Sequence, residues 1–501
     1  MSEWTTSLLA LFGFTVTYLT IPLIKSAAFK YGLISSPGGR RNHLSSTALS
    51  GGVAIYLPFL LVFSSFFGLL VMGKISINQP DRLKMLSLFL GTTWILILGT
   101  IDDKLNLGWR KKLLGQILGG LVLVLGGHTI ARATIPFIGL VDFGWSGIPL
   151  FVLAVIVVTN AINLIDGLDG LAGGICFFAA LTSSIIALAK GDFFTATMGF
   201  TISGSLLGFL MFNFPPASIF LGDGGSMMLG FLLGTLATSS VAISPGQRWG
   251  TSLMILIPFL PLGIPLFEVA LSILRRWIKG QALFTGDGDH IHHRLIGRIK
   301  NPRLTVALFY FFSAALCALT LLTVLEVGFK ITRFLSGLLM LVLFLGALAS
   351  IMLYRVGDLA VTLQNRSHFK FLGEFLRFMK QRIPRSKSFQ ELLSLLESGV
   401  RDLDFDSVEV IDDGETLTRW INPHPVHPDR ARIYCEDRVE GSRLTVRWVR
   451  PAHNDETYNE YIVLTWHRFL VAFKAEIAHR TWELSRRQRN KVVNLMRNNP
   501  E

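Results

Sequence analysis

Charged residues are scarce in this chain of 501 amino acids. They make up 16% of it, whereas hydrophobic residues make up 51% and the mean hydropathy is +0.50. Ordinary soluble domains carry charge on about a quarter of their residues. The shortage excludes an ordinary soluble protein and indicates a chain that crosses a membrane several times.

Cysteine is rarer still, with three residues in the whole chain. Cys176 and Cys317 fall in apolar runs and Cys435 lies near the C-terminal end, so they predict neither a disulfide framework nor a thiolate metal site. The residues before the first apolar run include no Lys or Arg, and no small-residue cleavage site is evident. We therefore interpret that run as a retained helix rather than a signal peptide.

Long apolar runs are what the sequence has in abundance. A membrane span needs about 20 mostly apolar residues, and we predict about eleven spans on that criterion. They lie near residues 5–24, 49–72, 85–101, 113–131, 147–165, 171–189, 194–212, 226–243, 251–273, 305–325 and 332–354. The predicted fold is a polytopic α-helical membrane protein with a C-terminal cytoplasmic α+β domain.

The net charge of +13 first suggests nucleic acid as a partner, but its distribution points elsewhere. Lys and Arg crowd into the loops after odd-numbered spans and are sparse in the others. An excess of basic residues marks cytoplasmic loops. We therefore expect the N-terminus outside, the odd-numbered loops and the tail in the cytoplasm, a multi-pass protein of a bacterial inner membrane, and no nucleic-acid partner.

The segment NAINLIDGLDGL, residues 160–171, places Asn163, Asp166 and Asp169 between two apolar runs. An ionisable group beside a bilayer is costly unless it faces water or a partner, which makes it a candidate functional group. The alternative is helix capping, since Asn and Asp side chains accept hydrogen bonds from free N–H groups at helix starts. Asp169 is the residue for which capping alone is the stronger alternative.

Two further odd-numbered loops carry polar clusters. In the first loop, Arg40, Arg41 and His43 suit an anionic phosphate, although an orientation signal explains them equally well. In the second, Asp102 and Asp103 are adjacent at the end of a span. Because neighbouring carboxylates repel, one suits a metal and the other a base, unless both are simply solvated.

The last two odd-numbered loops are also rich in functional groups. Asp223 stands between Gly222 and Gly224, and a glycine turn of this kind lets the backbone approach a phosphate while the carboxylate ligates Mg²⁺. The fifth loop gathers His290, His292, His293 and Arg294. These suit a phosphate better than a transition metal, because no Cys or Glu completes a ligand set.

All five polar clusters lie on one predicted face of the membrane, which indicates an active site at the interface. The alternative is a membrane transporter or lipid flippase with metal-stabilised cytoplasmic loops. A transporter is expected to place polar residues near the bilayer midplane, where this chain is almost entirely apolar. The distribution therefore favours an enzyme.

The segments IDD near residue 102, NAINLIDGLDGL, NFPPASIFLGDGGS and HIHHRL occur in this order. Together they resemble the polyprenyl-phosphate N-acetylhexosamine-1-phosphate transferase family over about residues 1–355. The resemblance implies transfer of a sugar-1-phosphate from a UDP-sugar to a polyprenyl phosphate such as undecaprenyl phosphate, with release of UMP and a requirement for Mg²⁺ or Mn²⁺. The HIHHRL form resembles the branch that uses UDP-N-acetylglucosamine more than the branch that uses UDP-muramoyl-pentapeptide.

The resemblance also implies roles for individual residues. Activation of the lipid phosphate falls to Asp102 and Asp103, nucleotide and metal contact to Asn163 and Asp166, and direct Mg²⁺ ligation to Asp223. The catalytic candidates are Asp102, Asp103, Asp166, His290, His292 and His293; the substrate-binding candidates are Asn163, Asp169, Arg294, Arg40, Arg41, His43 and Gly222; and the metal ligands are Asp223 and Asp166. The family usually has an acidic residue where Ser35 stands and prolines at residues 46–49, so the first loop departs from its pattern.

The composition changes to mixed charge after residue 355. We expect a transmembrane domain at 1–355, an amphipathic linker helix at 356–387 and a cytoplasmic α+β domain at 388–501. The linker helix suits either an anionic membrane surface or ordinary packing in a domain. Strands are predicted around residues 407–450 and a long helix at 461–494. The sequence leaves the role of this domain and the oligomeric state open, a homodimer being one alternative.

Overall fold

The computed structural model describes residues 3–35, 46–75, 77–135, 139–240, 257–278, 295–296, 298–324, 366–386, 405–412, 415–421, 432–438 and 444–451, together with positions 391, 394, 395, 398, 399 and 466. The chain forms two compact units. One comprises residues 1–273 and 286–348, and the other comprises residues 274–285 and 349–501.

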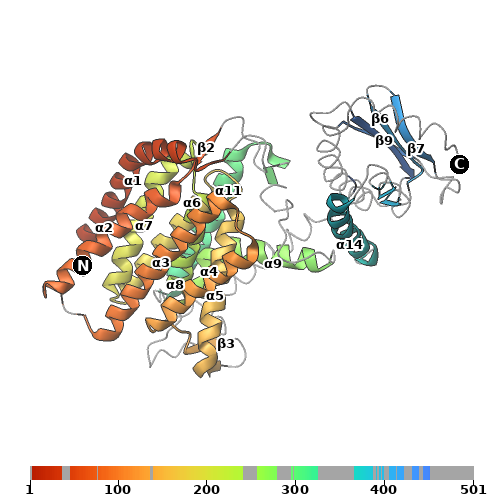
Figure 1. Ribbon diagram of the computed structural model, residues 1–501. Helices are drawn as coiled ribbons and strands as arrows, with labels where there is room; N and C mark the ends of the chain where they lie inside the picture. Colours follow the sequence, from red (N-terminus) through yellow and green to blue (C-terminus); the bar gives the residue numbers. More distant parts are fainter. Residues whose placement is uncertain are drawn as a thin grey trace. The chain divides into compact units, whose positions relative to one another are not determined.

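Helices account for most of the first unit (Figure 1). Among the described residues they are, in chain order, α1 (Glu3–Tyr31), α2 (Gly51–Val71), α3 (Gln79–Leu105), α4 (Trp109–Leu125), α5 (Gly147–Ile165), α6 (Leu171–Ala189), α7 (Phe193–Asn213), α8 (Gly222–Ser240), α9 (Gly263–Ile278) and α11 (Pro302–Val324). Residues 274–278 of α9 belong to the other unit. Short 3₁₀ turns, Gly144–Ser146 and Ile257–Leu262, precede α5 and α9.

Within the described residues, seven helical segments are long and apolar enough to cross a membrane, which confirms a multi-pass membrane protein. They coincide with helices α1, α2, α3, α5, α6, α7 and α11. Helix α4 has 17 residues, and the apolar segment Phe259–Ile273 is also short. The predicted span at 332–354 lies outside the described residues, so the count of eleven stays a prediction.

Helix ends coincide with the capping signals of the sequence. The side chain of Asn78 accepts a hydrogen bond from the Asp81 backbone N–H over 2.9 Å at the start of α3. Asn106, in the left-handed conformation with φ of 48°, ends that helix. Gly170, with φ of 77°, reverses the chain between α5 and α6. Such caps satisfy backbone groups that helix termini leave unpaired.

Helix α8 lies at the centre of the first unit, in contact with α2, α3, α5 and α6. Its apolar side chains from Met227 to Leu233 are buried. Because neighbouring helices rather than lipid surround it, α8 tolerates Gly, Ser and Thr along its length. The helix therefore provides a rigid support for the residues at its own N-terminus.

Glycines allow the backbones of α2 and α3 to approach the start of α8. A methyl group at Gly52 would lie 2.3 Å from Cα of Gly225, and one at Gly225 would lie 2.7 Å from Cα of Gly52. A methyl group at Gly99 of α3 would lie 2.5 Å from the carbonyl oxygen of Asp223. Only glycine fits at such separations, so these contacts fix where α8 begins.

Short strands connect the same region to the first loop. Strand β1 (Ile34–Ser35) pairs antiparallel with β2 (Thr47–Leu49), which in turn pairs in parallel with β5 (Ile219–Phe220). The Gly52 N–H also donates to the Leu221 carbonyl over 3.0 Å. A separate hairpin, β3 (Arg132–Ile135) and β4 (Gly139–Asp142), joins α4 to α5.

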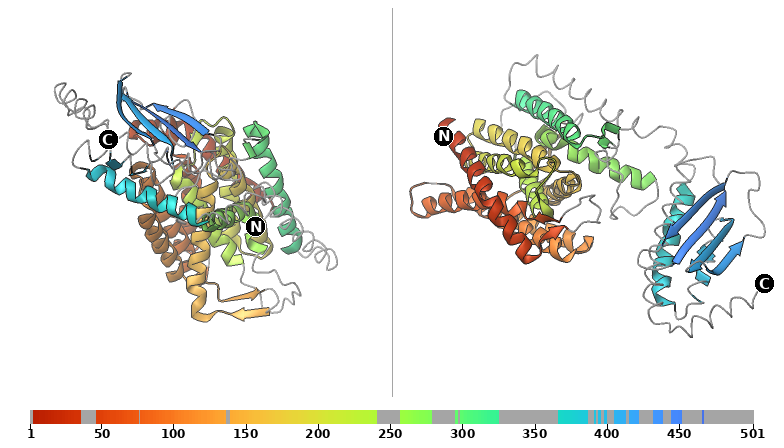
Figure 2. Two further views of the ribbon diagram at one scale, coloured as in Figure 1. Left: turned by 90° about the vertical axis from the view of Figure 1, so that its right-hand side faces the viewer. Right: turned by 90° about the horizontal axis from the view of Figure 1, so that it is seen from above.

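Within its described residues, the second unit has α14 (Arg366–Arg382), a 3₁₀ turn (Ile383–Arg385) and four strands, together with isolated helical positions. The strands are β6 (Ser407–Asp412), β7 (Glu415–Ile421), β8 (Arg432–Arg438) and β9 (Leu444–Pro451). They form one antiparallel sheet in the order β7-β6-β9-β8 (Figure 2). Phe405, Trp448 and Trp466 pack together as buried aromatic side chains in this unit. The helix predicted at 461–494 lies outside the described residues except for Trp466.

Candidate functional site

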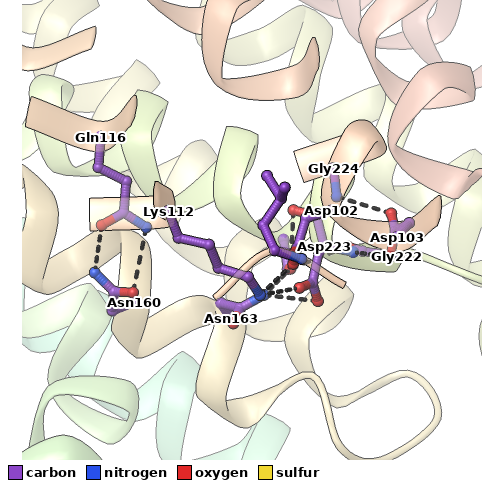
Figure 3. A network of polar contacts seen from close by, with 11 residues as sticks. Asp102, Asp103, Lys112, Gln116, Asn160, Asn163, Gly222, Asp223 and Gly224 are labelled. Carbon is purple, nitrogen blue, oxygen red and sulfur yellow. Dashed lines mark hydrogen bonds and ion pairs between the residues drawn. The ribbon is translucent and has the colours of Figure 1, made fainter. Parts of the chain in front are cut away.

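Four helix ends bring acidic and amide side chains together in the first unit (Figure 3). Asp102 and Asp103 come from the last turn of α3, Lys112 from the first turn of α4, Asn163 from the last turn of α5, and Asp223 from the first turn of α8. Residues from the second, third and fourth odd-numbered loops therefore meet at one end of the helical bundle, as the sequence predicts.

Lys112 occupies the centre of this cluster. Its Nζ forms an ion pair with Asp102 Oδ2 and a second ion pair with Asp223 Oδ2, the latter over 2.6 Å. The other oxygen of Asp102, Oδ1, accepts a hydrogen bond from the Leu107 backbone N–H over 2.6 Å. Asp102 is 3% exposed, whereas the Lys112 side chain keeps 26% exposure. One ammonium group is thus shared by two carboxylates.

Asp103 faces a different partner although it is adjacent to Asp102 in the chain. Its Oδ1 accepts the Asp223 backbone N–H over 2.9 Å, and its Oδ2 accepts the Gly224 N–H over 3.1 Å. These are free donors at the start of α8, where a negative charge is also favoured by the helix dipole. Gly222 has a φ of 75°, and a methyl group there would lie 2.7 Å from Asp103 Oδ2. The Asp103 carboxylate and the positive φ of Gly222 together fix the turn at the start of α8.

Asn163 orients the carboxylate of Asp223. Its Nδ2 donates to Asp223 Oδ1 over 3.1 Å and is 2.9 Å from the Ser226 hydroxyl. Ser226 in turn donates to the Gly222 carbonyl over 3.0 Å. The Asp223 carboxylate therefore has Lys112 on one oxygen and Asn163 on the other, which fixes its direction.

A pair of amide side chains, Gln116 of α4 and Asn160 of α5, lies one helical turn away from this cluster. Asn160 Nδ2 donates to Gln116 Oε1 over 2.7 Å, and Gln116 Nε2 donates to Asn160 Oδ1 over 3.2 Å. Gln116 is four residues after Lys112, and Asn160 is three residues before Asn163, so each pair of residues shares a helix face. The reciprocal bond joins α4 to α5 directly beside the cluster (Figure 3).

The turn between α5 and α6 is held by α7 and α11. Asp169 Oδ2 accepts the Ala217 N–H over 3.0 Å, and the Gly170 N–H donates to Asn213 Oδ1 over 2.9 Å. The Tyr310 hydroxyl of α11 donates to the Gly170 carbonyl over 2.6 Å. Asp166 is the C-cap residue of α5 and is half-buried. Asp169 thus makes a structural contact at this turn, in addition to the substrate role expected for it.

The charges of Lys112 and Asp223 reinforce each other. Burial raises the pKa of the Asp223 carboxyl, but the hydrogen bond with Asp102 and the charge of Lys112 outweigh burial and lower it to about 2. Burial lowers the pKa of Lys112, but the two carboxylates outweigh burial and raise it above its ordinary value. Both groups are therefore charged at neutral pH.

The oxygen donors of this cluster fit a hard divalent cation. Asp102 Oδ2 and Asp223 Oδ2 are close enough to share one ammonium group, so a single cation can contact both. Mg²⁺ usually takes one or two protein carboxylates and completes its shell with water and phosphate oxygens. In the part of the chain that the structure describes, no group of three or more His, Cys, Asp or Glu side chains is arranged to hold a metal without such outside ligands.

Several predicted site residues lie outside the described residues, namely Arg40, Arg41, His43, His290, His292, His293 and Arg294. For the first loop, its two ends are described: Ser35 is paired with Thr47, and β2 continues the pairing to β5, which leads into Gly222. The loop therefore leaves and rejoins the bundle beside the acidic cluster.

Sequence reasoning missed two features of the site. The sequence places Lys112 among the basic residues of the odd-numbered loops, which indicate only membrane orientation, and it gives Gln116 no role. The available signal was spacing, because Lys112 and Gln116 stand four residues apart at the start of an apolar helix. Polar residues at that spacing form one polar line on an apolar helix surface.

Comparison with known proteins gives consistent similarities. Residues 85–241 match the family described as glycosyl transferase family 4. The chain is 33% identical over 303 residues to the protein named "Probable undecaprenyl-phosphate N-acetylglucosaminyl 1-phosphate transferase" of Bacillus subtilis, covering 60% of this chain and 80% of that protein. It is 32% identical over 325 residues to the decaprenyl-phosphate N-acetylglucosaminephosphotransferase of Mycobacterium leprae, covering 60% and 80%. It is also 32% identical over 313 residues to the phospho-N-acetylmuramoyl-pentapeptide-transferase of Halalkalibacterium halodurans, covering 59% and 91%.

Proposed function

Because this chain belongs to the polyprenyl-phosphate N-acetylhexosamine-1-phosphate transferase family, we propose that it transfers N-acetylglucosamine-1-phosphate from UDP-N-acetylglucosamine to undecaprenyl phosphate. The products are UMP and a lipid-linked sugar diphosphate, the first membrane intermediate of a cell-envelope polysaccharide. The observation that carries the proposal is the meeting of Asp102, Asn163 and Asp223 around Lys112 at one end of the bundle.

The chemistry explains why such a cluster suits this transfer. An oxygen of the lipid phosphate attacks the β-phosphorus of the donor, and the bond from that phosphorus to the bridging oxygen breaks, with UMP as the leaving group. Both reactants are anions, so positioning and charge neutralisation do most of the catalytic work. When bound, Mg²⁺ or Mn²⁺ supplies that neutralisation, and we assign Asp223, Asp102 and Asp166 as the residues that hold it.

The remaining residues position these groups. Asn163 directs the Asp223 carboxylate, and Asp103 holds the start of α8 through the backbone N–H groups of Asp223 and Gly224. Asp103 therefore contributes by position, and we assign activation of the lipid phosphate to Asp102, in addition to its contact with the cation. A phosphate monoester has a second pKa of about 6, so the acceptor needs little deprotonation at neutral pH. His290, His292, His293 and Arg294 are proposed to hold the diphosphate and the sugar, and Arg40, Arg41 and His43 to contact a phosphate from the first loop.

The identity of the UDP-sugar donor is the most specific part of the proposed function. Two of the relatives are named for N-acetylglucosamine phosphate transfer, and a third is named for transfer of a phospho-muramoyl-pentapeptide. The HIHHRL segment resembles the first branch, which favours UDP-N-acetylglucosamine. We further propose that the site faces the cytoplasm, as the distribution of Lys and Arg between the loops indicates.

The test is an assay of the purified full-length protein with undecaprenyl phosphate, Mg²⁺ and a panel of donors. The panel contains UDP-N-acetylglucosamine, UDP-N-acetylgalactosamine and UDP-muramoyl-pentapeptide, and the readout is UMP release together with the mass of the lipid product. We expect turnover with the first donor and its loss when Mg²⁺ is chelated. If UMP were released only from one of the other donors, that donor would be the substrate instead. If none of the donors released UMP, the proposed transfer would be contradicted.

A further inference from the structure

The ammonium group of Lys112 contacts two carboxylates at once. Its Nζ contacts Asp102 Oδ2 and Asp223 Oδ2, while the second oxygen of each carboxylate is engaged by the Leu107 N–H and by Asn163. The two Oδ2 atoms are therefore the oxygens directed toward a shared cation. Under the proposed function, they are also the oxygens that a divalent cation must contact.

Lys112 and a divalent cation thus compete for the same two atoms. A lysine ammonium is a compact point charge on a flexible stem, whereas Mg²⁺ and Mn²⁺ carry twice the charge and prefer carboxylate oxygens. The ammonium and the cation cannot sit between these oxygens together, because their like charges would repel at close range. The Lys112 side chain can move away from these oxygens toward solvent, because 26% of it is exposed at the start of α4.

We propose that Lys112 is an exchangeable counter-ion, which yields Asp102 and Asp223 to the divalent cation and then binds a substrate phosphate. This inference rests on the proposed function. It gives the Lys112 ammonium group a second position, in which its positive charge binds a substrate phosphate. The neighbouring Arg110 is exposed and adds positive charge at the start of α4.

A fixed structural bridge would behave in the opposite way. If Lys112 only held Asp102 and Asp223 in position for the metal, removing it would let the carboxylates separate and metal binding would weaken. If Lys112 competes with the metal, removing it strengthens metal binding while phosphate binding is lost. The two interpretations therefore differ in the sign of one measurement.

The experiment measures Mn²⁺ binding to the purified full-length protein by electron paramagnetic resonance of the free ion, without donor or acceptor. The variants are Lys112→Met, which keeps the length of the side chain, and Lys112→Gln, which keeps a polar end. Lys111→Met is the matched control, because it removes the same charge from the neighbouring, exposed position. Asp223→Asn tests the metal site itself. Turnover of each variant is measured with both substrates varied.

Removing a competing charge-assisted hydrogen bond is expected to tighten Mn²⁺ binding about tenfold or more in both Lys112 variants. Lys111→Met should bind as the unchanged protein does. Turnover of the Lys112 variants should fall, with a raised KM for the UDP-sugar if the donor diphosphate is the phosphate bound, or for undecaprenyl phosphate if the lipid phosphate is.

Unchanged or weaker Mn²⁺ binding in both Lys112 variants would overturn the inference, and so would tighter binding with full turnover and unchanged KM values. Asp223→Asn separates this failure from a failure of the proposed site. If that variant binds Mn²⁺ as the unchanged protein does, then the assignment of the metal ligands is wrong, whatever the Lys112 variants do.

Discussion

The carboxylate of Asp103 accepts a hydrogen bond from the backbone N–H of Asp223 over 2.9 Å. Asp103 therefore caps the start of α8, although it lies 120 residues earlier in the chain. The next N–H, that of Gly224, reaches the other oxygen of Asp103 over 3.1 Å. Asp103 therefore sets the position from which the side chain of Asp223 extends. Its effect on the proposed chemistry passes through the backbone of α8.

We predict that Asp103→Asn lowers both stability and turnover. The amide keeps one acceptor oxygen, but its NH₂ group opposes the second backbone N–H. Loss of such a cap costs about 0.5–2 kcal/mol of unfolding free energy. Thermal unfolding in detergent and UMP release measure the two effects. Asp81→Asn, an exposed residue in the first turn of α3, serves as the control, and a variant at 103 that melts as its parent does would contradict the capping role.

Gly99→Ala should disturb the start of α8 from the side of α3. The added methyl group would lie 2.5 Å from the Asp223 carbonyl oxygen and 2.6 Å from Cα of Gly224, and backbone atoms cannot rotate away as a side chain can. Overpacking of this kind costs about 1–3 kcal/mol, and turnover should fall with it. Gly68→Ala in α2 is the matched control, since nothing lies within 4 Å of its methyl position. Equal melting temperatures for the two variants would show that α3 and α8 separate easily.

The Gln116 and Asn160 pair predicts non-additive energetics. Each side chain donates to the other, so Gln116→Ala and Asn160→Ala remove the same interaction. A double-mutant cycle on thermal unfolding should give a coupling of about 0.6 kcal/mol, the average for hydrogen bonds between membrane helices. Turnover should fall in each variant because α4 carries Lys112 and α5 carries Asn163. Strictly additive effects would mean that the pair does not act as a unit.

Deletion of residues 366–501 should leave the transfer reaction in place. The relatives that define the family align with about 60% of this chain, and every described residue of the acidic cluster lies before residue 227. The truncated protein is expected to release UMP at a rate within a few fold of the full chain, with altered regulation as the only loss. A well-folded truncation that releases no UMP would place an essential residue in the second unit.

Much of the fold follows from the sequence because lipid imposes a simple rule on it. Seven apolar runs became membrane-length helices, and the Asn and Gly residues at their ends became caps and turns. The bounds were less predictable, since α1 extends to Tyr31 and α3 to Leu105, beyond the predicted runs. A helix continues past its apolar stretch as long as its backbone hydrogen bonds are satisfied, and hydropathy does not report that.

The candidate site was predictable in its members but less so in their roles. Asp102 and Asp103 are indistinguishable in the sequence, yet consecutive residues of a helix point about 100° apart, so one faces Lys112 and the other faces α8. Lys112 itself cannot be told apart, in the sequence, from neighbouring basic residues that indicate only membrane orientation. Its role depends on a helix pairing between α3, α4 and α8, which no local pattern encodes.

The contact between Gly52 and Gly225 has a consequence for how related chains can vary. Each glycine faces the Cα atom of the other, so a side chain at either position meets main chain that cannot be exchanged for a smaller group. No substitution elsewhere relieves that overlap, because the obstacle is the polypeptide itself. We expect natural lineages to keep both glycines together, and a lineage that replaced one would have no single-step repair.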